Sequence, residues 1–208
     1  SGRDKNFLEK WFGQLPVTLV AEHGAFTKIP GAEWMQIIAE NSAWKESVIS
    51  MIKRESKKYP GSFVEVKEQS IAWHFRNALL PAKEIETLKE RFSGWLTAHG
   101  LQLLEGNKVI EVKQQGVDKG TAVKQFLALM KDTFMLAIGD DRTDEDLFHA
   151  IPPEAYTVKV GTPSIHARYY ITSQPGVIKL LRMLLNDNSE KSDKTEVTIL
   201  KDEAARIE

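Results

Sequence analysis

The chain has 208 residues, of which 42% are hydrophobic and 27% charged, enough for one compact domain or two small ones. Its 28 basic and 29 acidic side chains give a net charge of -1, which excludes a general electrostatic attraction to nucleic acid or to anionic lipid. There is no cysteine, and no apolar run approaches the ~20 residues that span a bilayer, so we expect a cytoplasmic protein without disulfides or a membrane anchor.

The first third of the chain predicts a helix, a strand and a long helix. Residues 1–13 place apolar side chains at helical spacing, and the apolar run 15–21 is typical of a short buried strand. From Trp34 to Lys58 apolar residues recur with a period near 3.6, which predicts a helix that stops before Pro60-Gly61.

Two hairpins and a helix follow. Residues 62–67 and 70–75 alternate apolar and polar side chains on either side of a short polar connection, which predicts a hairpin. A helical stripe runs from Pro81 to Gly100, and a second hairpin is expected from 101–104 and 108–112. We therefore predict a two-layer α+β module.

After this module, helices and strands alternate in the pattern of an α/β fold with a parallel sheet. The expected elements are helix 120–130, strand 133–138, helix 144–150, strands 156–160 and 169–172, and helix 175–185.

An α/β domain built from both ends of the chain is thus interrupted by an insertion. The predicted domains are 1–29 with 114–186, the inserted module 30–113, and a polar tail 187–208, in which we expect little order even for the short stretch 197–200.

The most specific motif is Gly-Asp-Asp-Arg-Thr-Asp-Glu-Asp, residues 139–146, directly after an apolar strand. Carboxylates at the carboxyl end of such a strand face the ligand crevice of an open α/β sheet, and Mg²⁺ prefers hard oxygen ligands. Asp140 and Asp141 are therefore the predicted Mg²⁺ ligands. The alternative is that Thr143 and Asp144 merely cap a helix whose first turn favours acidic residues.

This motif resembles the fourth motif of trehalose-6-phosphate phosphatases, a family of the haloacid dehalogenase-like group. Ser1-Gly2-Arg3 resembles the second motif and Gly116-Val117-Asp118-Lys119-Gly120 the third. Residues 21–26 (AEHGAF) and 70–78 (SIAWHFRNA) resemble segments that mark the trehalose-phosphate branch. The matches follow the family order from residue 1 to about 185.

The resemblance implies a Rossmann-like haloacid dehalogenase core with an inserted α+β cap domain, and Mg²⁺-dependent hydrolysis of trehalose 6-phosphate through an aspartyl phosphate. It makes Ser1, Lys119, Asp140 and Asp144 catalytic, with Ser1, Gly2 and Lys119 binding phosphate. For Lys119 a surface position at the start of a helix is the plain alternative.

In the cap, the resemblance implies that Glu65, Lys67, Arg76 and Glu111 contact the sugar. Glu65 and Lys67 are two apart on one strand and so face the same way. The alternative is a solvated face whose cross-strand ion pairs contribute little to stability. The five histidines show no metal-ligand spacing and are expected to be structural or exposed.

The family's first motif, Asp-x-Asp-Gly-Thr with its nucleophilic aspartate, is absent from the 208 residues. We therefore expect this chain alone to be inactive, as a fragment or a part of a longer protein. A non-catalytic regulatory domain attached to a trehalose-6-phosphate synthase is the alternative function, and a phosphatase for another phosphosugar is a third.

Overall fold

The computed structural model describes residues 1–37, 42–129 and 133–186. The chain divides into two compact units, Ser1–Ala122 and Val123–Glu208, which are described separately below. The predicted tail 187–208, with its stretch 197–200, lies outside the described residues.

The first unit begins with helix α1 (Lys5–Phe12), whose N-cap Asp4 accepts a hydrogen bond from the Phe7 amide. An antiparallel sheet follows, in the order β1-β2-β3, with a 3₁₀ turn, η1, after β1. The bounds are β1 Leu19–Ala21, η1 Glu22–Gly24, β2 Phe26–Lys28 and β3 Met35–Gln36. Leu8, Ala21, Phe26 and Val117 form the small core of this part.

Two elements of this part of the chain differ from their predictions. The strand expected at 15–21 begins only at Leu19, because Pro16 cannot donate to a sheet and Leu15 is half exposed. The helix expected from Trp34 begins only at Lys45, and residues 35–36 instead pair with β2. Trp34 is held by tertiary contacts, since its indole N–H donates to Glu9 over 2.9 Å.

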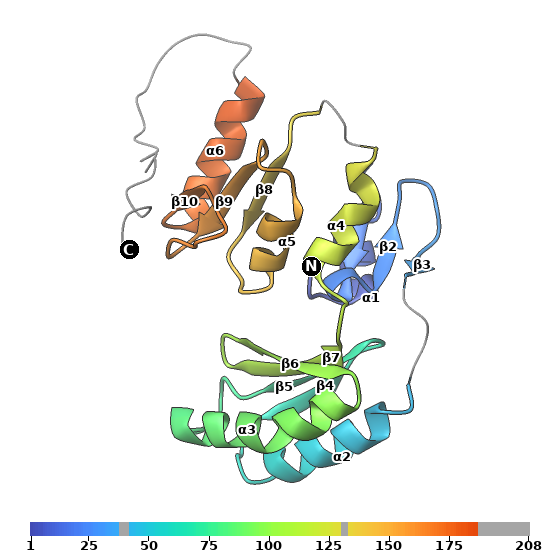
Figure 1. Ribbon diagram of the computed structural model, residues 1–208, viewed down its shortest axis with the longest axis vertical. Coiled ribbons are helices and arrows are strands. Elements are labelled where there is room, and N and C mark those ends of the chain that lie inside the picture. The colour runs from blue at the N-terminus through green and yellow to red at the C-terminus, as the bar shows by residue number, and fades with distance from the viewer. Residues whose placement is uncertain (38–41, 130–132, 187–208) are drawn as a thin grey trace. The chain divides into compact units, whose positions relative to one another are not determined.

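The rest of the first unit is a four-stranded antiparallel sheet in the order β4-β5-β7-β6, here called the hairpin sheet. Its strands are β4 Phe63–Val66, β5 Ser70–His74, β6 Leu101–Gly106 and β7 Val109–Gln114, with helices α2 (Lys45–Ser56) and α3 (Ala82–Ala98). Both predicted hairpins and the helix between them are confirmed. Figure 1 shows α2 and α3 on the same side of this sheet.

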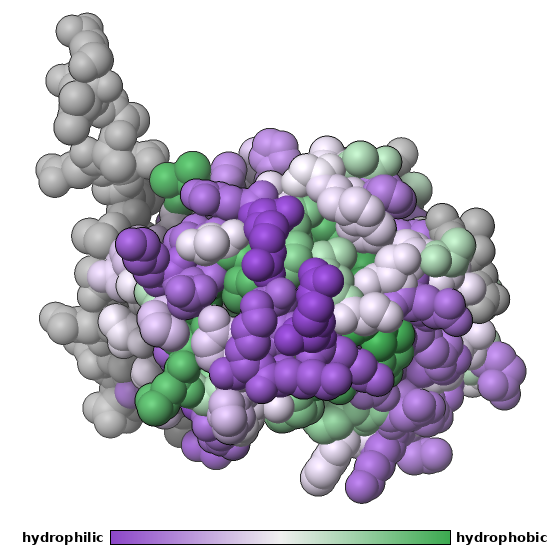
Figure 2. Space-filling view, turned by 90° about the horizontal axis from the view of Figure 1, so that it is seen from below, coloured by the Kyte–Doolittle hydropathy of each residue, from purple (hydrophilic) through white to green (hydrophobic). Residues whose placement is uncertain are grey.

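Alternating side chains give the hairpin sheet two different faces. One face packs on the helices and contains the largest core, in which Ile71, Trp73, Val112 and Leu96 are almost fully buried. The outer surface of the helices is mostly hydrophilic, with separate apolar patches, as Figure 2 shows. The other face of the sheet carries polar side chains, and these include three of the four predicted sugar-binding residues.

The second unit has a parallel sheet, as predicted, and its strand order is β10-β9-β8. Its elements are β8 Leu136–Gly139, α5 Asp144–Ala150, β9 Tyr156–Val160, β10 Tyr169–Ile171 and α6 Gln174–Asn186; α4 (Lys119–Leu127) crosses the boundary between the units. The carboxyl end of β8 leads directly into the acidic motif, so the fold presents these carboxylates where the sequence predicts them.

Within the described ranges no helix combines the length and apolar character that a bilayer crossing requires. The described elements form a mixed α/β protein. The domain boundaries at 29, 113 and 186, and the cytoplasmic location, stay predictions.

Candidate functional site

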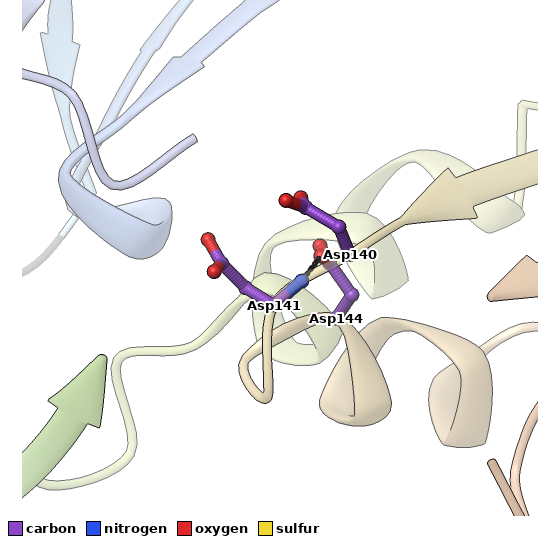
Figure 3. A group of neighbouring side chains, drawn as sticks. All are labelled: Asp140, Asp141 and Asp144. Atoms are coloured by element: carbon purple, nitrogen blue, oxygen red, sulfur yellow. Dashed lines mark hydrogen bonds between the residues drawn. The ribbon is translucent and has the colours of Figure 1, made fainter. Parts of the chain in front are cut away.

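Three carboxylates converge after β8. Asp140, Asp141 and Asp144, here called the aspartate cluster, each offer an oxygen, and these oxygens lie within 4.8 Å of one another. Asp140 and Asp141 are exposed, whereas Asp144 is buried, and its Oδ2 accepts a hydrogen bond from the Asp141 amide over 2.9 Å. Figure 3 shows the three side chains at the β8–α5 connection. Such a set of hard oxygen donors fits Mg²⁺.

Gly139 makes room for this arrangement. A Cβ atom at residue 139 would lie 2.1 Å from Asp144 Cγ, so only glycine lets the carboxylate of Asp144 fold back over the strand end. Thr143 is the N-cap of α5, as the capping alternative expects, but its side chain makes no capping hydrogen bond. Asp146, in contrast, lies inside α5 and is exposed.

Lys159 supports the cluster and was missed at the sequence level. It lies on β9 opposite Gly139, and its Nζ donates to the Asp141 carbonyl over 2.7 Å and pairs with Glu145 at 3.1 Å. A lysine inside the mostly apolar strand 156–160 was the available signal, because buried lysines are almost always paired.

The hairpin sheet brings three of the four predicted sugar-binding residues onto one face. Glu65, Ala72 and Glu111 are direct partners across β4, β5 and β7, so their side chains share that face. Lys67 and Ser70 flank the β4–β5 turn in the next row. We call Glu65, Lys67, Ser70, Ala72 and Glu111 the polar face; the small Ala72 separates its two carboxylates.

Glu111 is the best connected residue of the polar face. Its Oε1 accepts hydrogen bonds from Lys67 Nζ at 2.8 Å and Ser70 Oγ at 2.6 Å, and its Oε2 lies 3.0 Å from His23 Nε2. Lys67 Nζ also donates to the Gly2 carbonyl over 3.0 Å. The polar face is therefore tied to the predicted phosphate-binding segment within the first unit.

These contacts determine the charge states. Burial opposes ionisation of Glu111, but the hydrogen bond from His23, the positive charge that His23 carries when protonated, and the charge of Lys67 lower the pKa of Glu111 to about 2. Burial lowers the pKa of His23 and outweighs Glu111, which raises it, so at neutral pH we assign His23 as neutral and Glu111 as ionised. The neutral His23 then donates from Nε2.

The shifted pKa of Glu111 predicts acid sensitivity. Because it falls from 4.5 to about 2 on folding, ionised Glu111 stabilises the fold fully above pH 4.5, and this contribution is lost as the pH falls towards 2. We expect a loss on the order of 2 to 3 kcal/mol in the free energy of unfolding, measured by urea denaturation at each pH. Glu111→Gln should reduce this dependence of the free energy of unfolding on pH, and Glu105→Gln should not. The same pH dependence in Glu111→Gln as in the original chain would contradict the assignment.

Glu65, the second carboxylate of the polar face, also contacts a histidine. Its Oε2 lies 2.7 Å from His74 Nε2, and the His74 ring stacks on Phe63. The side chain of Glu65 is 40% exposed, so its carboxylate is accessible to a ligand. Both histidines belong to the family-marking segments 21–26 and 70–78, which was the signal that could have found them.

The remaining predicted residues have these positions. Arg76 lies beyond the end of β5, is exposed and donates to the Asn107 carbonyl. Ser1 Oγ accepts from the Arg3 amide, and the Ser1 carbonyl accepts from the His23 amide. Lys119 begins α4, and its charge lowers the pKa of His23, so it lies in the neighbourhood of His23.

Comparisons with known proteins identify relatives of this chain. The family model described as trehalose-phosphatase matches residues 1–174. The bifunctional trehalose-6-phosphate synthase/phosphatase of Thermoproteus tenax is 42% identical over 186 residues, which cover 88% of this chain and 25% of that protein. The trehalose-phosphatase of Saccharomyces cerevisiae is 30% identical over 235 residues, which cover 91% of this chain and 26% of that protein. The chain thus spans about a quarter of the length of these curated relatives.

A solved structure gives the same result for the fold. The C-terminal domain of C. albicans trehalose-6-phosphate phosphatase matches with a TM-score of 0.81 and 30% identity, covering 88% of this chain and 76% of that chain. This confirms the predicted haloacid dehalogenase-like α/β fold. On its sequence and its structure, the chain belongs to the trehalose-phosphatase family.

Proposed function

We propose that this chain is the phosphatase domain of a protein that hydrolyses trehalose 6-phosphate to trehalose and phosphate. The observation that carries the proposal is the aspartate cluster, in which three carboxylates converge at the carboxyl end of β8. Carboxylates in this position hold the divalent cation that phosphoryl transfer uses. The named activity of the relatives supports the same reaction.

Mg²⁺ is the cofactor of this proposal. Asp140 and Asp141 would hold it, with Asp144 completing the donor set, and bound Mg²⁺ would neutralise and orient phosphoryl oxygens. The ammonium group of Lys119, the hydroxyl of Ser1 and the backbone of Gly2 are proposed to bind the phosphate group. Each of these groups stabilises negative charge as it develops on the phosphoryl oxygens.

The nucleophile is the missing part. The family reaction passes through an aspartyl phosphate, and the 208 residues contain no Asp-x-Asp-Gly-Thr segment. A serine hydroxyl and a lysine do not replace a carboxylate nucleophile and its neighbouring acid and base. We therefore propose that a segment outside this sequence supplies the nucleophile and that the chain alone does not turn over substrate.

The polar face is proposed to select the sugar, as part of a cap formed by residues 30–113. Glu65 and Glu111 can accept hydrogen bonds from sugar hydroxyls, and Lys67 can donate. A site built from such groups discriminates strongly against ligands that lack the matching hydroxyls. A different phosphosugar would use the same phosphate-binding groups, and glucose 6-phosphate is the comparison that separates the two.

The alternative is a regulatory, non-catalytic domain attached to a synthase. A synthase domain in the same polypeptide is part of our proposal, since the relative from Thermoproteus tenax is named as bifunctional. Against a purely regulatory role, the sequence retains Lys119 as well as the three aspartates, and Gly139 makes the room that Asp144 needs. A domain without catalysis has no need of this close packing.

Phosphate release tests the proposal. We expect no release from trehalose 6-phosphate by this chain with Mg²⁺, and release that EDTA abolishes from a version carrying the Asp-x-Asp-Gly-Thr segment. Glucose 6-phosphate serves as the second substrate. Metal-dependent release by the 208 residues alone would show that they contain a nucleophile, and no release by the longer version would favour the regulatory alternative.

A further inference from the structure

The η1 turn has an unusual backbone. Glu22 and His23 adopt φ angles of 45° and 62°, in the left-handed region that non-glycine residues rarely occupy. Both side chains are nevertheless buried, with exposed fractions of 2% and 6%. Strained backbone of this kind persists only where the surrounding structure enforces it, and it concentrates at functional positions.

The two side chains reach different parts of the hairpin sheet. The carboxylate of Glu22 accepts hydrogen bonds from the amides of Gln69 at 2.7 Å and Glu68 at 3.3 Å, which fixes the turn between Lys67 and Ser70. His23 reaches further and contacts Glu111, 88 residues later in the chain. The strained turn therefore contacts the polar face through His23 and the adjoining turn between β4 and β5 through Glu22.

His23 also packs against the predicted phosphate-binding segment. A Cβ atom at residue 2 would lie 2.7 Å from His23 Cε1, so glycine is required there for the imidazole to fit. The ring thus lies between Gly2 on one side and the carboxylate of Glu111 on the other. Lys67 also contacts both residues, since its Nζ donates to the Gly2 carbonyl and to Glu111 Oε1.

The hydrogen bond from His23 to Glu111 leaves the other ring nitrogen of His23 in an unfavourable state. With Nε2 donating to Glu111, Nδ1 is a buried acceptor that has no hydrogen-bond partner among the described residues. A buried unpaired acceptor destabilises a fold. Glu111 in turn uses three of its roughly four acceptor positions on protein groups, which leaves about one for a ligand hydroxyl.

We propose that His23 is a positioning residue for substrate selection, which holds Glu111 at a fixed place relative to the phosphate-binding segment Ser1-Gly2. The inference rests on the proposed function. A substrate whose phosphate and sugar are joined at a set spacing gains from this fixed geometry, because the binding groups need no rearrangement. Inorganic phosphate, which does not reach Glu111, gains nothing from it.

Calorimetric binding to the 208-residue chain tests this. His23→Asn tolerates the left-handed backbone but removes the donor at Nε2, whereas His23→Gln places an amide N–H near the same point. We expect His23→Asn to weaken binding of trehalose 6-phosphate by about tenfold and His23→Gln to restore most of it, with phosphate binding changed less than about twofold in both. His99→Asn, at the exposed end of α3, is the matched control.

The other outcomes are distinguishable. If the original chain does not bind trehalose 6-phosphate more tightly than glucose 6-phosphate, the proposed function fails and the inference with it. Only the inference fails if the original chain prefers trehalose 6-phosphate but His23→Asn binds it equally well. The same holds if His23→Asn weakens binding of trehalose 6-phosphate and of inorganic phosphate by the same factor. If His23→Asn does not fold, a double-mutant comparison replaces it. In a protein that already carries Glu111→Gln, adding His23→Gln should not weaken binding of trehalose 6-phosphate any further. Losses of affinity that add up in the double variant would overturn the inference.

Discussion

Replacing Asp140 with alanine is expected to abolish Mg²⁺-dependent phosphate release in a version of the protein that carries the nucleophilic segment. Asp140 is exposed and belongs to the aspartate cluster, so its loss removes a ligand without opening a cavity. A correctly bound cation stabilises the transition state by several kcal/mol. Because Asp140→Ala removes this stabilisation, we expect kcat/KM to fall by at least ~1000-fold. Steady-state phosphate release at saturating Mg²⁺ measures it.

The control is Asp146→Ala, which removes the same charge from the exposed surface of α5, two residues after Asp144. Its activity should stay within about threefold of the original, as for most surface substitutions. The 208-residue chain gives a second measurement, in which electron paramagnetic resonance follows binding of Mn²⁺ as a probe. Activity and Mn²⁺ binding that both survive Asp140→Ala would refute the assignment of the cluster as the metal site.

The second large effect is expected for Glu65→Ala, again in the version with the nucleophile. Hydrogen bonds to charged groups contribute about 1.5–3 kcal/mol, so kcat/KM for trehalose 6-phosphate should fall by about 10- to 100-fold. Hydrolysis of a small aryl phosphate should change less than about twofold, because in the proposed function only the sugar of trehalose 6-phosphate extends to the polar face. Parallel assays with the two substrates measure the difference.

Glu105→Ala is the matched control for this change. Glu105 lies on β6 of the same sheet, but its carboxylate bonds Lys89 on α3 at 2.7 Å and so does not belong to the polar face. It should leave both substrates unaffected. Equal losses on both substrates in Glu65→Ala would contradict a role in sugar selection.

The sequence predicted the hairpin sheet and the parallel sheet well, because their local patterns and their final environments agree. Strands such as 70–75 alternate strictly, and one face is buried against helices as the pattern requires. The region from Trp34 to Ile37 shows the opposite case. Its apolar spacing is typical of a helix, but Met35 and Gln36 pair with β2, a contact that no local pattern encodes.

The candidate site likewise contains residues that the local sequence predicts and residues that it does not. Asp140, Asp141 and Asp144 are neighbours in sequence, so a single motif predicted their meeting. His23 looked structural because its partner, Glu111, is 88 residues away and belongs to a different sheet. Histidine is used in so many ways that its role becomes clear only from its neighbours in space.

The long sequence separation of the contacts made by η1 also has a consequence for folding. The two hairpins of the hairpin sheet pair residues at most 13 apart in the chain, and β5 and β7 pair residues 35 to 43 apart. Glu22 and His23 contact this sheet over longer gaps of 47 and 88 residues. Contacts that close long loops form late, because the chain entropy of closure is lost before the contacts stabilise it. The hairpin sheet should therefore acquire native pairing first, and Glu111 should acquire its final surroundings only in the last steps of folding.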